Sequence, residues 1–335
     1  GLVFARLSRI VPETGGPYAY ARKGFGDFAG FLVAWGYWIS IWASLPAIAI
    51  AATDYLQVLV PVLSDAPVTN LTIALVLMIG VALLNLMGTK EAGKFQLIVV
   101  CLKLVPFLAV SFIGLFWVEW GHFTPINPTK MSFFLALAGT APFIMFAFSG
   151  VESATVPAGD VTNPKRTIAI ATIAGTLIAA AIYTFGTMSV LGVMGRAALE
   201  QSGAPFSDAA NLMWGGWAGY VIAAAAVLSS IAALNGWTLI MGQIPLAAAR
   251  HGLLPQAFAD LNRNGVPAKG IIISVSLSVA ILVMQSSGSK ALISVYEFVV
   301  RLSTVADMVP YVLCCFVEGV ILITLGKRIG YLNPL

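Results

Sequence analysis

Residues 142–166 read PFIMFAFSGVESATVPAGDVTNPKR, and this stretch decides the fold. It begins as an apolar run that can enter a bilayer, but Ser149-Gly150 and Glu152 interrupt it near its centre. Glycine weakens a helix, and backbone groups freed within hydrocarbon must be satisfied by protein or by a water-filled cavity. Interrupted helices with a buried acid are typical of solute sites in secondary transporters. The alternative is a packing helix that tolerates glycine and whose Glu152 pairs with a neighbouring helix.

The composition indicates an all-α polytopic membrane protein. The chain is 59% apolar and 10% charged, whereas soluble domains carry about 25% charged residues. The net charge of +4 is small and dispersed, so we expect a lipid bilayer and no nucleic acid as partner. The cysteines and histidines show no metal-ligand spacing, and we expect neither a metal nor a cofactor. They are Cys101, Cys314, Cys315, His122 and His251.

Eight apolar runs are long enough to span a bilayer. They lie at residues 27–60, 70–88, 95–118, 133–157, 167–194, 217–245, 269–286 and 292–325. The first and last runs exceed one bilayer thickness, so we expect each to tilt, to bend at Pro46 or Pro310, or to end outside the hydrocarbon. Because the chain opens on the last turns of a helix and stops after a cationic flank, we interpret it as an internal fragment of a longer protein.

The distribution of Lys and Arg over the loops predicts the orientation of these spans. Thirteen lie in one set of alternate loops: Arg6, Arg9, Arg22, Lys23, Lys90, Lys94, Lys165, Arg166, Arg250, Arg263, Lys269, Lys327 and Arg328. The other set holds only Lys130, Arg196 and Lys290. The first set is therefore expected in the cytoplasm, and the run 133–157 is expected to cross from outside to inside.

A few polar residues fall inside predicted spans. Arg301 follows Glu297 by four residues, a spacing that predicts an intrahelical ion pair. Asp307 is expected to serve either Arg301 or a polar cavity. Lys103 has no partner in its own run, so it must find one on another helix or lose its proton. Trp237 lies near the middle of its run, which favours a pocket wall over the interfacial anchor that most membrane tryptophans form.

Several motifs resemble those of the amino acid–polyamine–organocation (APC) permeases, in particular the bacterial amino acid antiporter and permease branch. They occur in the family's order and cover nearly the whole chain. They are Pro12–Tyr20 with Gly24-Phe25-Gly26, Phe148–Ala154, Asn163–Arg166, Ala204–Ala209, Asn235-Gly236-Trp237, and Asp260-Leu261-Asn262 with Gly265-Val266-Pro267.

The resemblance implies the LeuT-type inverted-repeat transporter fold in a single domain over residues 1–335. Residues 1–26 would be the end of helix 2 and a cytoplasmic loop, 27–118 would be helices 3–5, and 119–335 would be helices 6–10 of the second repeat. Helix 1, most of helix 2, and helices 11 and 12 would be absent. About half of the family's substrate site would then be missing.

The resemblance also implies roles for individual residues. Phe146 matches a gating aromatic, and the carbonyls around Phe146, Ala147, Ser149 and Gly150 would accept hydrogen bonds from the substrate's α-ammonium. Trp237 matches a substrate-packing tryptophan, Ser303 a polar position of helix 10, and Glu152 a gate-linked acid. Ile41 and Leu45 stand where an arginine-selective pocket has polar residues, so a neutral or apolar amino acid is favoured over a cationic one.

Lys103 matches a lysine that occupies the sodium site in sodium-independent relatives, although a purely structural ammonium is the alternative. The expected function is secondary amino acid transport in the cytoplasmic (inner) membrane, by sodium-independent exchange or proton-coupled uptake. An amino-acid-binding sensor without transport is the alternative, and a homodimer is possible. An enzyme is not expected, because no nucleophile–base pair or metal site is recognisable.

Overall fold

The computed structural model describes residues 1–13, 15–65, 67–88, 102–127, 130–156, 158, 161–286 and 292–326. These residues form helices and connecting loops and contain no β-strand. Six of their helices are long and apolar enough to cross a membrane, and two shorter apolar helices are Leu102–Trp117 and Ala268–Met284. Each of the eight predicted runs coincides with one of these helices, which confirms the all-α membrane architecture.

The helices have the following bounds. The longer ones are α1 (Leu2–Ile10), α2 (Pro17–Phe25), α3 (Asp27–Leu59), α4 (Pro67–Met87), Leu102–Trp117, α6 (Phe133–Phe148), α7 (Pro164–Gln201), α8 (Pro205–Trp214), α9 (Gly216–Arg250), α10 (Ala268–Ser286) and α11 (Leu292–Gly326). Short turns are η1 (Pro61–Asp65), η4 (Trp120–Phe123), η5 (Ser153–Thr155) and η7 (Gln256–Ala259). Leu102–Trp117 widens at η2 (Ala109–Ile113) and tightens at η3 (Gly114–Trp117), and α7 is interrupted at Gly195, whose φ is 71°.

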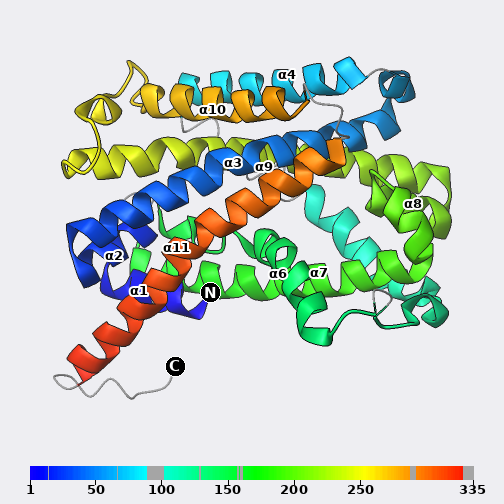
Figure 1. The fold of residues 1–335 in the computed structure, drawn as a ribbon, viewed down its shortest axis with the longest axis horizontal. Helices are drawn as coiled ribbons and strands as arrows, with labels where there is room; N and C mark the ends of the chain where they lie inside the picture. Colours follow the sequence, from blue (N-terminus) through cyan, green and yellow to red (C-terminus); the bar gives the residue numbers. More distant parts are fainter. Residues whose placement is uncertain are drawn as a thin grey trace.

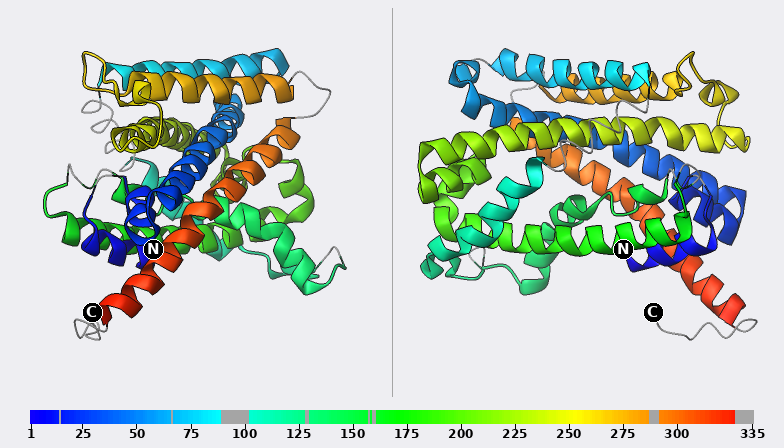
Figure 2. Two further views of the ribbon diagram at one scale, coloured as in Figure 1. Left: turned by 60° about the vertical axis from the view of Figure 1, so that its left-hand side comes forward. Right: turned by 180° about the vertical axis from the view of Figure 1, so that it is seen from behind.

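The long helices pack in layers (Figure 1). Helices α4 and α10 lie side by side on one side of the molecule, and α9 and α3 lie beneath them. Helix α11 runs alongside α3, and α6, α7 and α1 cover the opposite side (Figure 2). Helix α3 packs most extensively against α9 and α11, so it is the central helix of the described residues.

Helix α3 is central because its apolar residues point to neighbours on several sides. Val33, Ile41 and Leu45 are among its buried side chains. Two hydrogen bonds tie it to α10: Trp38 Nε1 donates to Ser274 Oγ at 2.7 Å, and Ser278 Oγ donates to the Trp42 carbonyl at 2.5 Å.

The helices of the first and last predicted runs are inclined to their neighbours. Helix α3 has 33 residues and α11 has 35, which makes each about 50 Å long in a hydrocarbon layer of about 30 Å. Both helices continue through their internal prolines, Pro46 and Pro310. They are inclined to α4 and α10 in both figures, as expected for helices longer than the bilayer is thick.

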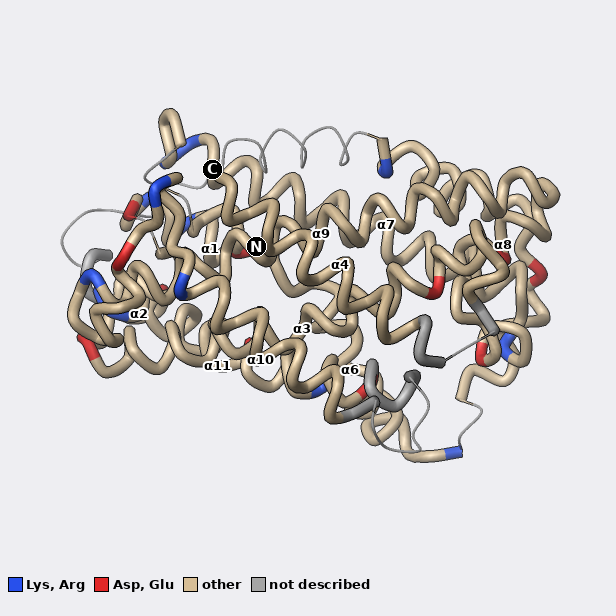
Figure 3. Tube along the Cα trace, turned by 90° about the horizontal axis from the view of Figure 1, so that it is seen from above, with Lys and Arg blue, Asp and Glu red and all other residues tan. Residues whose placement is uncertain are grey.

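Lys and Arg of the described residues gather at the end of the molecule where α2 lies (Figure 3). This grouping agrees with the predicted cytoplasmic set of loops. Four members of that set, Lys90, Lys94, Lys327 and Arg328, lie outside the described residues, as do Lys290 of the other set and Cys101.

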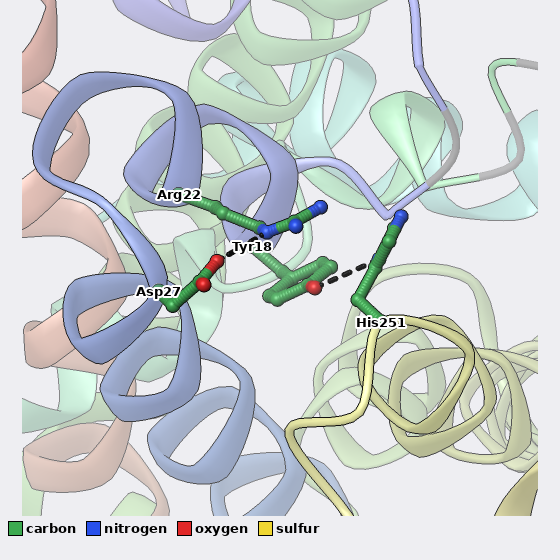
Figure 4. Close-up of polar contacts among 4 residues, drawn as sticks. All are labelled: Tyr18, Arg22, Asp27 and His251. Carbon is green, nitrogen blue, oxygen red and sulfur yellow. Dashed lines mark hydrogen bonds and ion pairs between the residues drawn. The ribbon is translucent and has the colours of Figure 1, made fainter.

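Four residues make polar contacts at this end of the molecule (Figure 4): Tyr18, Arg22, Asp27 and His251. Tyr18 Oη lies 2.9 Å from His251 Nδ1, which joins α2 to the end of α9, and Arg22 Nε donates to Asp27 Oδ1 at 2.7 Å. Burial raises the pKa of Tyr18, and the hydrogen bond to Asp27 raises the pKa of Arg22. The phenol therefore keeps its proton, and it shares a hydrogen bond with His251 Nδ1.

We predict that Gly36→Val destabilises the protein, because a Cβ at this position would lie 3.1 Å from the Ala306 carbonyl oxygen and 3.3 Å from Val309 Cβ on α11. Overpacking of this kind typically costs about 1–3 kcal/mol. Thermal unfolding in detergent measures the effect. The control is Gly80→Val in α4, where a Cβ meets no atom within 4 Å; equal melting temperatures for the two variants would contradict the α3–α11 contact.

Candidate functional site

The predicted interruption of the run 133–157 is present. Helix α6 ends at Phe148, Ser149 N donates to the Phe146 carbonyl at 3.1 Å, and the chain then turns before η5. Gly150 has φ of 106°, a conformation that favours glycine. A Cβ on Gly150 would lie 3.0 Å from the Trp237 ring. The backbone therefore passes close to the indole, and the last carbonyls of α6 lack the helical partners of an unbroken helix.

Glu152 follows the break and is completely buried. Tyr37 Oη donates to Oε1 at 2.6 Å, Tyr311 Oη donates to Oε2, and Gly150 N donates to Oε2 at 3.2 Å. These donors come from α3, α11 and the break itself, so the carboxylate joins three segments. Glu152 lines neither of the two cavities described below. It has hydrogen-bond partners on neighbouring helices, as expected for an acid buried within a membrane.

A cavity of about 240 Å³ lies beside the break. It is lined by Ser40, Ile41, Ser44 and Ile48 of α3, Phe146, Ala147 and Ser149 of α6 and the break, Tyr183 of α7, Trp237 of α9, and Ser303 of α11. Six of the eight residues expected at the substrate site are therefore brought together: Ile41, Phe146, Ala147, Ser149, Trp237 and Ser303. Leu45 is fully buried in the core and lines neither cavity.

A larger cavity of about 520 Å³ adjoins the break. Gly150 and Lys103 line it, together with Thr172 and Thr176 of α7. Ala147, Ser149, Tyr183 and Trp237 line both cavities. The two spaces are therefore neighbours that meet at the break and the indole.

Comparison with known proteins decides the family. Residues 1–323 match the amino acid permease family. The chain belongs to the amino acid permease family. Three relatives are each 30% identical to this permease. The cadaverine/lysine antiporter of Escherichia coli strain K12 aligns over 93% of this chain and 71% of its own length. The putrescine transporter PotE of the same strain aligns over 92% and 70%, and a putative arginine/ornithine antiporter of Bacillus subtilis strain 168 over 92% and 71%.

The permease is thus an APC superfamily protein of the inner membrane that crosses the bilayer several times. Its family and relatives are transporters of amino acids and polyamines, not enzymes. Among the described residues, no group of three His, Cys, Asp or Glu side chains could hold a metal ion.

Asp307 is a second buried acid near the break, and its exposed fraction is 4%. Ser149 Oγ donates to Oδ2, and Ser40 Oγ lies 3.2 Å from Oδ1. Asp307 therefore contacts two residues of the smaller cavity's wall but lines neither cavity itself. Arg301 instead lies 3.8 Å from Glu297 on α11, which confirms the predicted intrahelical pair.

In the part of the chain that the structure describes, neither Glu152 nor Asp307 forms an ion pair with a Lys or Arg side chain. Within the described residues, the Lys and Arg ion pairs all involve other carboxylates. Lys103, the other charged group at the break, is half-buried and forms no hydrogen bond or ion pair with another described residue.

Sequence reasoning missed several residues of this region, among them Ser40, Ser44, Tyr37, Tyr183 and Tyr311. A signal existed for the serines, which are polar, four residues apart and on one face of an apolar helix. Tyr37 and Tyr183 reach the site from helices remote in the sequence, and no local pattern singles them out.

We predict that Gly150→Ala in the permease reduces substrate binding. An L-residue at positive φ costs about 1–2 kcal/mol, and the new methyl group would press on the Trp237 ring, 3.0 Å away. Gly139→Ala in α6 is the matched control, because its Cβ would meet no atom within 4 Å. Equilibrium binding of a transported substrate checks this, and wild-type affinity in Gly150→Ala would contradict the close approach of backbone and indole.

Proposed function

We propose that the permease is a secondary transporter that moves an amino acid or an amine across the inner membrane by alternating access around the broken helix. The observation that carries this proposal is the end of α6 at Ser149-Gly150, beside two adjoining cavities that are both lined by Ser149 and Trp237. Substrate sites at interrupted helices are the rule in secondary transporters. The relatives named as antiporters and transporters support the same conclusion.

In this mechanism the smaller cavity receives the substrate. The last carbonyls of α6, around Phe146, Ala147 and Ser149, carry the negative end of the helix dipole and accept hydrogen bonds from the α-ammonium. Trp237 packs against the substrate, and Ser303 contributes a polar contact from α11. Glu152 links the break to α3 and α11 through Tyr37 and Tyr311, so it serves the gate and makes no contact with substrate.

The fold that accompanies this mechanism is the LeuT-type inverted repeat, in which helices of the two repeats rock against each other. The long central α3 and the broken α6 support it, because both are positions at which such a fold places its substrate site. Transport then proceeds either as exchange of substrates or as uptake with a proton.

Sodium independence follows from Lys103. Its ammonium adjoins the break in the larger cavity and supplies a fixed positive charge there, next to freed backbone carbonyls. A sodium ion in the same space would be repelled by this charge and is not needed to balance it.

Transport in proteoliposomes tests the proposed function. Vesicles loaded with an unlabelled amino acid or diamine take up the labelled compound, and uptake persists when all sodium is replaced by choline. A panel of lysine, ornithine, 1,5-diaminopentane and neutral amino acids at two pH values separates exchange from proton coupling. Absence of uptake for the whole panel, with binding retained, would favour the sensor function instead.

We further predict that Lys103→Ala lowers the initial transport rate about tenfold or more, a change that corresponds to about 1.4 kcal/mol of lost interaction. The control is Lys165→Ala, because Lys165 is exposed in the first turn of α7. Equal rates for the two variants in the same vesicles would show that the Lys103 charge is structural only.

A further inference from the structure

Two asparagine side chains meet between membrane-spanning helices. Asn85 of α4 and Asn235 of α9 are 0% and 1% exposed. Asn85 Nδ2 donates to Asn235 Oδ1 and to the Val81 carbonyl oxygen, both at 3.0 Å. An amide nitrogen has two hydrogens, and these two bonds use both. The Asn85–Asn235 bond therefore joins α4 to α9, the helix that lies beneath it (Figure 1).

This pair adds little to stability. Asn85 Oδ1 is buried and has no hydrogen-bond partner among the described residues. A buried acceptor without a donor destabilises a protein at least as much as one hydrogen bond stabilises it. Because a hydrogen bond is directional, the main effect of the pair is on geometry: it restricts the rotation of α9 against α4.

The end of α4 is itself held by the loop that follows α9. Asn262 Nδ2 and Asn264 Nδ2 both donate to the Leu86 carbonyl at 3.0 Å. Asn262 Oδ1 in turn accepts from Asn264 N at 2.9 Å and from Val266 N at 3.0 Å, which orders the loop. Since Leu86 directly follows Asn85, the donor amide belongs to a turn of α4 that is fixed in place.

Asn235 and Trp237 lie on opposite sides of α9. Two residues of an α-helix that are two positions apart differ in direction by about 200°. Asn235 accordingly contacts α4, whereas Trp237 lines both cavities at the break. A rotation of α9 therefore moves both side chains together. Because side chains extend about 5–6 Å from the helix axis, a rotation of about 10° displaces a side-chain tip by about 1 Å.

The packing around Asn235 does little to prevent such a rotation. Its neighbours on the same face, three residues to either side, are Ala232 and Thr238, and both are small and buried. Small side chains permit close helix approach, but they interlock less than large ones. Thr238 Oγ1 has no hydrogen-bond partner among the described residues, so it adds no second bond. Asn235 supplies the directional contact of this turn.

We propose that Asn85 and Asn235 are positioning residues, whose hydrogen bond sets the rotation of α9 and thereby holds the Trp237 indole against the break at Gly150. Neither asparagine lines a cavity, so both act through Trp237. The inference rests on the proposed function in one respect, that Trp237 packs against the substrate there.

The test replaces asparagine by leucine, which has nearly the same shape without the polar atoms. Binding of labelled L-lysine and L-leucine and thermal unfolding are measured for the purified wild type, Asn85→Leu and Asn85→Leu/Asn235→Leu. The matched control is Ser207→Ala. It removes a buried hydrogen bond of 2.8 Å to the Gly219 carbonyl, on the same helix but about five turns from Trp237.

Asn85→Leu is expected to lower both the melting temperature and the affinity, because Asn235 Oδ1 loses this donor. The double variant should regain the melting temperature, since removal of both partners by groups of the same shape is nearly neutral. Its binding should nevertheless stay about 3- to 10-fold weaker than that of the wild type, the range for one lost aromatic contact. In a Trp237→Ala background, Asn85→Leu should not change the affinity further.

Ser207→Ala should lower the melting temperature and leave binding unchanged. Three results would overturn the inference and leave the proposed function standing: wild-type affinity in the double variant, an undiminished effect of Asn85→Leu in the Trp237→Ala background, or an equal loss of binding in Ser207→Ala. If the double variant does not fold, Asn85→Ser replaces it, because serine is too short to reach Asn235.

A second measurement needs no substrate. Trp237→Cys is introduced into a protein whose three native cysteines are replaced by alanine, and its rate of modification by methanethiosulfonate ethylammonium is followed. Asn85→Leu should change this rate several-fold and Ser207→Ala should not; an unchanged rate in both would overturn the inference. Failure of the wild type to bind either amino acid, with no uptake of any compound in the transport panel, would overturn the proposed function, and the thiol rates would then decide the inference.

Discussion

The structure depends on one constraint: inside a bilayer, a helix can stop only where protein satisfies the backbone groups that are set free. At the break of α6, the freed backbone N–H groups bond to nearby carbonyls and to the side chain of Glu152. Ser149 N and Ser153 N donate to carbonyls within the turn, and Gly150 N donates to the carboxylate of Glu152. That carboxylate is in turn held by the phenols of Tyr37 and Tyr311. A single buried acid thus fastens the interruption to the two long helices that flank it.

Two buried acids, Glu152 and Asp307, share this small region, and their hydrogen-bond partners differ. Glu152 receives three hydrogen bonds and is sealed from both cavities. Asp307 receives only hydroxyls that belong to the wall of a cavity. Buried polar groups are tolerated when they are hydrogen-bonded, and both acids meet this condition with donors from more than one segment. The two acids therefore differ in what they contact: Glu152 joins the break to α3 and α11, whereas Asp307 contacts the wall of the smaller cavity.

The sequence predicted the helices well and the site only in part, for physical reasons. Apolar runs such as 27–60 set the spans, since bilayer thickness dictates their length. The Ser149-Gly150 pair, followed closely by Glu152, revealed the break. The Glu297–Arg301 pair was accessible because it is local. Leu45, in contrast, was chosen by its place in a motif, whereas the side that a helix presents to a cavity depends on its rotation against α9 and α11. Tyr37 and Tyr311 act on Glu152 across more than a hundred residues, so only the folded chain unites them.

The glycine pair Gly15-Gly16 has a consequence for motion. Gly15 N donates to the Val156 carbonyl at 2.9 Å, and a side chain on Gly16 would overlap Thr155. The start of α2 is therefore seated on the turn that follows the break, while Tyr18 ties the same short helix to the end of α9. If the segment beyond the break rotates, α2 moves with it, because Gly15 is bonded to Val156. Such a movement of α2 relative to α9 breaks the Tyr18–His251 hydrogen bond. Helix α2 thus connects the turn after the break to the end of α9, where Lys and Arg gather.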